Sequence, residues 1–72
     1  MPRIDMAATG ANIASLRKKN NISVQELKTL MGLSTQTICK WQRGECLPTV
    51  DNLVILADIL NVTVNDILVV TY

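Results

Sequence analysis

Hydrophobic residues recur at intervals of three and four along most of the chain, which is the period of an α-helix with one buried face. The clearest case is the segment from Val50 to Leu60, where Leu53, Leu56 and Ala57 share a face with Leu60. Shorter stretches of the same pattern occupy residues 10–20, 24–31, 35–43 and 63–68. In the second of these stretches the apolar stripe consists of Val24, Leu27, Leu30 and Met31. The pattern therefore predicts an all-α fold, a compact bundle of five helices with short connections.

Hydroxyl residues stand where each of these segments begins: Thr9, Ser23, Ser34, Thr49 and Thr63. A side-chain oxygen there accepts a hydrogen bond from the unpaired N–H groups of a first helical turn. Ser23 is followed three residues later by Glu26, which is the spacing of a capping box. Gly32 follows the second segment, where a helix often ends with a positive φ. The first helix is accordingly expected to start after Thr9.

The 72 residues correspond to one domain. We expect an N-terminal arm at residues 1–8, a helical domain at 9–68 and a short tail at 69–72. The tail, with Val69 and Val70, is rich in residues that favour strands. Ile4 and Met6 of the arm are expected to pair with it as a strand, within one chain or between two. No apolar run approaches the roughly 18 residues that a membrane helix needs.

The charges are distributed unevenly along the chain. All seven basic residues lie in residues 1–43 together with two acidic residues, so this part carries 7 − 2 = +5. Residues 44–72 contain four acidic residues and no basic one, which gives −4 and a sum of +1. A basic face backed by an acidic one suits a nucleic-acid partner, although an ordinary mixed surface explains the charge equally well.

The residue types disfavour an enzyme. Cys39 and Cys46 are accompanied by no histidine, so they cannot complete a tetrahedral zinc shell. With no secretion signal, both are expected to be reduced thiols. There is no phosphate-cradling glycine loop and no set of nucleophile and base. We expect no catalytic residue, no metal and no cofactor.

Only Gly32, Leu33 and Ser34 separate the second and third predicted helices, and so short a turn forces a steep crossing typical of a helix-turn-helix. Further motifs occur in order from Ile13 to Leu68: LR at 16–17, SVQEL at 23–27, GLS at 32–34, Ile38, WQRG at 41–44, Pro48 and LxxLAxxLxV at 53–62. Together they resemble a Cro/CI-type (XRE-like) helix-turn-helix domain. The resemblance implies a lambda-repressor-like fold that binds double-stranded DNA, usually as a homodimer on a two-fold site. It also implies a bacterial or phage protein of the cytoplasm.

The base-reading positions of that family fall on Thr35, Gln36 and Lys40. Helical spacing supports this independently, because Gln36 and Lys40 are four residues apart and share a face. Ile38 and Trp41 are expected to point the other way, into the core. Gln can pair with the edge of adenine and Lys with guanine, while the methyl group of a Thr can contact thymine. The alternative is a solvated helix face.

The candidates for phosphate contacts are Ser34, Thr37, Arg43 and Lys28, together with the N-terminal amides of the second helix, where the helix dipole favours an anion. For each single Lys or Arg, a merely solvated side chain is an equally good interpretation.

Three positions depart from the family pattern. Val24 stands where Gln is common, and Lys28 stands where a small residue is common. Gln42 replaces a frequent Glu, so we expect Arg17 to form a hydrogen bond with a neutral acceptor in place of an ion pair.

A second apolar surface is predicted from residues that fall outside the core face: Ile55, Ile59, Val69, Val70 and Tyr72. Exposed apolar patches often mark interfaces, and we expect this one to form a two-fold dimer contact. The alternative is scattered surface aliphatic residues on a monomer.

Two functions fit the sequence. The first is a sequence-specific transcriptional regulator, a repressor, that reads the major groove with the helix at residues 34–43. The second is a protein-interaction module, such as an antitoxin or an adaptor, built on the same fold.

Overall fold

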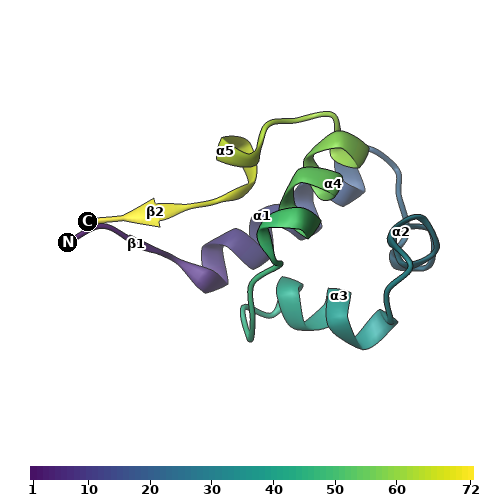
Figure 1. The fold of residues 1–72 in the computed structure, drawn as a ribbon, viewed down its shortest axis with the longest axis horizontal. Helices are drawn as coiled ribbons and strands as arrows, with labels where there is room; N and C mark the ends of the chain where they lie inside the picture. Colours follow the sequence, from purple (N-terminus) through teal and green to yellow (C-terminus); the bar gives the residue numbers. More distant parts are fainter.

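The computed structural model describes all 72 residues and contains five helices and one short ribbon of two strands (Figure 1). The elements in chain order are β1 (Arg3–Ile4), α1 (Met6–Lys19), α2 (Val24–Met31), α3 (Thr35–Gln42), α4 (Val50–Leu60), α5 (Val64–Ile67) and β2 (Val70–Thr71). In Figure 1, α3 lies at the bottom of the molecule and α5 at the top, with the ribbon projecting to one side. The predicted five-helix fold is confirmed.

Nine buried side chains form one core to which every helix contributes: Ile13, Leu27, Ile38, Trp41, Leu53, Leu56, Ala57, Leu60 and Ile67. The four residues from α4 are those that the helical period placed on its inner face. With four of the nine residues, α4 contributes more to this core than any other helix.

Leu30 departs from the predicted apolar stripe of α2, because it is 62% exposed. At 100° per residue, Val24 and Met31 lie on one side of the fully buried Leu27, and Leu30 lies on the other. The helix turns the Val24–Met31 side toward the core and leaves Leu30 in solvent.

The predicted caps of α2 to α5 are confirmed. Ser23 and Glu26 form a reciprocal capping box, as do Thr63 and Asp66. Ser34 and Thr49 each accept a hydrogen bond from the third residue of their helix. These bonds satisfy N–H groups that no preceding turn can reach, so each helix begins where its hydroxyl residue stands.

The prediction for the start of α1 was wrong. The helix begins at Met6, because the Asp5 carboxylate accepts the Ala8 N–H at 2.9 Å and caps it first. Thr9 is fully buried, and its Oγ1 accepts the N–H of Val69 at 3.0 Å. The hydroxyl that local sequence assigned to a cap therefore joins α1 to the C-terminal tail.

The two ends of the chain pair with each other. Arg3 lies opposite Thr71 and Ile4 opposite Val70 in an antiparallel register, and the Asp5 N–H donates to the Val69 carbonyl at 2.8 Å. The pairing thus forms within one chain and includes Ile4, whereas Met6 is helical. No helix is long and apolar enough to cross a membrane.

Candidate nucleic-acid interface

The joint between α2 and α3 has the geometry that its short sequence predicts. Gly32 caps α2 in the left-handed conformation, with φ at 66°. The Leu33 N–H then donates to the Lys28 carbonyl at 3.1 Å, and Ser34 starts α3. A residue with a Cβ rarely adopts this φ, so glycine is what allows the chain to reverse within three residues. The two helices form a helix-turn-helix.

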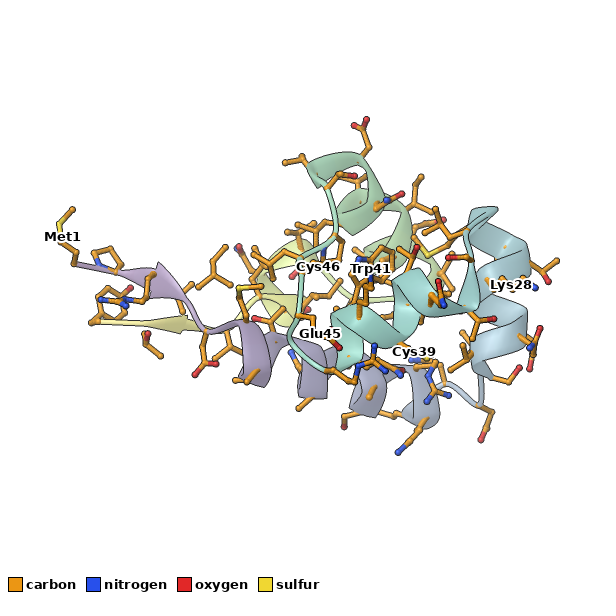
Figure 2. The ribbon with its side chains drawn as sticks, turned by 90° about the horizontal axis from the view of Figure 1, so that it is seen from below. Met1, Lys28, Cys39, Trp41, Glu45 and Cys46 are labelled. Atoms are coloured by element: carbon orange, nitrogen blue, oxygen red, sulfur yellow. The ribbon has the colours of Figure 1, made fainter.

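Two buried side chains fix the inner face of α3. Ile38 is fully buried and Trp41 is 3% exposed. Figure 2 shows Trp41 pointing from α3 toward α4 and Cys39 on the other edge of the helix. Both residues were predicted to anchor the helix, and both do. Trp41 is therefore not available to stack on a base.

The close approach of α1 and α3 was missed by the sequence reasoning. A Cβ built on Gly10 would lie 2.2 Å from the Trp41 carbonyl oxygen and 2.8 Å from that of Gln42. The backbones of α1 and α3 are thus in direct contact at a buried glycine. The signal in the sequence was a glycine inside a helix, where it is less favourable than alanine by about 0.5–1 kcal/mol.

The outer face of α3 carries the three predicted base-reading residues. Gln36 and Lys40 are exposed and Thr35 is half-buried, and their side chains form no hydrogen bond or ion pair within the chain. In Figure 2, α3 faces the viewer with no other element in front of it. An α-helix with its side chains is about 10–12 Å in diameter, and the major groove is about 12 Å wide. The face is free to enter a groove.

Ser34 and Thr37, predicted to contact phosphate, are bonded to each other. Their hydroxyl oxygens lie 2.9 Å apart, and Ser34 Oγ also accepts the Thr37 N–H at 3.2 Å. One of the two O–H groups donates to the other, so the pair has one hydroxyl hydrogen left for an anion.

Arg43 forms an ion pair with Glu45, and both side chains are more than half exposed. Such exposed pairs contribute only about 0–1 kcal/mol, so a phosphate can compete for the guanidinium.

Lys28 is half-buried on α2 (Figure 2), which fits a packed stem with an outward ammonium group. It has no acidic partner in the chain. Val24, which also departs from the family pattern, lies one helical turn before Lys28 and packs against the core.

The predicted bond between α1 and α3 is confirmed. Arg17 Nε donates to Gln42 Oε1 at 2.9 Å, and Arg17 Nη1 donates to the Ile22 carbonyl at 2.9 Å.

The two cysteines are unpaired thiols, each partly buried. Cys46 packs against the core.

The predicted dimer residues are divided between two places. On α4, Ile55 is 44% exposed whereas Ile59 is partly buried against the core. In the tail, Val70 and Tyr72 are exposed and Val69 is partly buried. The ribbon points away from α4 in both figures, so the predicted residues belong to two separate elements. Two exposed residues of α4, Val50 and Val54, were missed by the sequence reasoning.

The three-residue joint, the anchored inner face of α3 and its free outer face define a helix-turn-helix domain of the DNA-binding class. The chain belongs to the XRE-type helix-turn-helix family, whose family model, described as Helix-turn-helix, matches residues 13–67. This match begins at the buried Ile13 of α1 and ends at Ile67, so it includes the whole core.

One curated relative is the cryptic phage CTXphi transcriptional repressor RstR of Vibrio cholerae serotype O1. It is 33% identical over 55 residues, which are 76% of this chain and 49% of that protein. The chain thus spans about half the length of this relative.

Two solved structures share the fold. The restriction-modification controller protein C.AhdI from Aeromonas hydrophila has a TM-score of 0.79 at 24% identity, covering 88% of this chain and 96% of that one. The clp gene regulator ClgR from Corynebacterium glutamicum has a TM-score of 0.79 at 22% identity, covering 86% and 66%.

Proposed function

We propose that this protein is a transcriptional repressor that binds double-stranded DNA sequence-specifically and reads the major groove with α3. The observation that carries the proposal is the outer face of α3, where Gln36 and Lys40 are exposed while Ile38 and Trp41 are buried behind them. Membership of the helix-turn-helix family supports DNA binding. The similarity to a phage repressor supports repression, and it also suits the bacterial cytoplasm as the place of action.

Each base-reading residue has a stated role. Gln36 pairs with the edge of an adenine through its amide, Lys40 donates to a guanine, and Thr35 packs its methyl group on a thymine. A good bidentate pair contributes about 1–3 kcal/mol of discrimination against a wrong base. Arg43, Lys28 and the Ser34–Thr37 pair bind phosphates and set the orientation of α3, without reading sequence.

The protein acts as a homodimer on a two-fold site. Half-sites lie about 34–36 Å apart, which is comparable to the longest dimension of the molecule, 36 Å. Two copies in contact therefore reach both half-sites. The exposed residues of α4 and of the ribbon supply the apolar surface for this contact. Sedimentation at high micromolar concentration tests this: a sedimentation coefficient that remains that of the monomer contradicts the dimer.

Selection from a pool of random duplexes tests the function directly. Enrichment of one sequence motif, with binding that weakens as salt increases, is the expected result. If no duplex is retained at low salt, DNA binding is refuted and the protein-interaction module becomes the better assignment.

A matched pair of variants then separates base contacts from phosphate contacts. Gln36→Ala should weaken binding to the selected site by about 1–3 kcal/mol and relax the preference at one base pair. Arg43→Ala should weaken binding to all sequences and reduce the salt slope by about 0.9. Equal loss on all sequences in the Gln36 variant would show that this residue only touches the backbone.

A further inference from the structure

Arg17 is a cation that the fold holds in place without neutralising it. Two of its five N–H groups are engaged, by the Gln42 amide oxygen and the Ile22 carbonyl, each at 2.9 Å. Both acceptors are neutral, and the one ion pair in the chain joins Arg43 to Glu45. The guanidinium is thus fixed in position while it keeps its full charge and three unused donors.

The position of Arg17 is at the edge of the outer face of α3. Gln42 follows Thr35 by seven residues, which is two helical turns, so the two side chains lie along the same edge of the helix. Thr35 is one of the three residues assigned to base contacts. A duplex that reaches Thr35 brings its backbone toward the far end of the same edge, where Gln42 holds Arg17.

We propose that Arg17 binds a DNA backbone phosphate and that Gln42 is its positioning residue, with a neutral acceptor that leaves the charge available. This inference rests on the proposed function. A carboxylate in place of the Gln42 amide would hold Arg17 at least as firmly, but it would cancel the charge. An arginine that only joined α1 to α3 would be held at least as well by the carboxylate, so only the phosphate role predicts that this substitution weakens DNA binding.

Gln42→Glu is the decisive variant. If Arg17 binds phosphate, this variant should bind every duplex more weakly, and the slope of log K against log salt should become shallower by about 0.9. The factor by which affinity falls between 50 and 200 mM salt should then be about 3.5 times smaller than for the unchanged chain. Its melting temperature should be unchanged or higher, because an ion pair replaces a neutral hydrogen bond.

Two controls isolate the charge at this point. Asn65→Asp makes the same change in net charge on α5, which lies on the opposite side of the molecule from α3 (Figure 1). It should leave the salt slope unchanged, because charges farther apart than about 8–10 Å are screened. Gln42→Met removes the acceptor and leaves Arg17 charged but no longer held by α3, so affinity for every duplex should fall while the salt slope stays close to that of the unchanged chain.

An unchanged salt slope in Gln42→Glu, in a chain that binds DNA normally otherwise, overturns the phosphate role of Arg17 and leaves the proposed function intact. Absence of DNA binding by the unchanged chain refutes the proposed function itself, so the two failures are distinguishable.

Discussion

Gly10→Ala tests the packing of α1 against α3, because helix propensity and tertiary contact predict opposite effects there. In an isolated helix the substitution is stabilising by about 0.8–1.0 kcal/mol. In this fold the new Cβ would lie 2.2 Å from the Trp41 carbonyl oxygen and 2.8 Å from that of Gln42. Both contacts are with backbone, so no side chain can rotate to relieve them.

The cost follows from the distance that α3 must move. Ordinary van der Waals contact begins at 3.4 Å, so an approach of 2.2 Å requires a retreat of about 1.2 Å. Overpacking a tight site costs about 1–3 kcal/mol, occasionally more, and a displaced helix belongs at the upper end. After the gain in propensity, we expect a net loss of about 2 kcal/mol. For a domain of this size, that lowers the melting temperature by about 8–16 °C.

Thermal and urea denaturation of the variant measure this loss. Ser15→Ala, at an exposed position of the same helix, is the matched control and should not destabilise the protein. Because α3 carries the proposed base-reading face, Gly10→Ala should also weaken binding to the selected duplex. A variant as stable as the unchanged chain would refute the close approach of α1 and α3.

Two further predictions concern the ends of the chain. Thr9→Val removes the acceptor of the Val69 N–H and should cost about 1–3 kcal/mol, with faster amide exchange at Val69; unchanged exchange would contradict a stabilising role for this bond. Hydrogen bonds from Thr63 hold the pKa of Asp66 below its usual value of 3.8. The pKa of Asp66 is thus lower in the folded than in the unfolded chain. The ionised Asp66 carboxylate therefore stabilises the fold above about pH 4, and this stabilisation is lost as the pH falls through the folded-state pKa. In urea titrations, the difference in unfolding free energy between the unchanged chain and Asp66→Asn should therefore shrink between pH 6 and pH 3. A constant difference would show that the Asp66 carboxylate does not stabilise the fold.

The helices, their caps and the two faces of α3 could be predicted from the sequence, because they depend on residues within four positions of one another. A hydroxyl before a helical run and a glycine after it act through hydrogen bonds to the adjacent turn, as Ser23 and Gly32 do. The inward direction of Ile38 and Trp41 follows from the helical period alone. The bond from Arg17 to Gln42 was predictable only through the family resemblance, since 25 residues separate the two.

Contacts between distant segments were decided by the tertiary structure. Thr9 has the local pattern of a cap, and only the tail packed beside it makes its hydroxyl the acceptor for Val69. Leu30 has the spacing of a core residue, and only the direction in which α2 packs leaves it in solvent. Gly10 is an unfavourable residue for a helix until α3 lies against it. In each case the local pattern is compatible with two environments, and the free energy of packing elements that are far apart in the chain selects one of them.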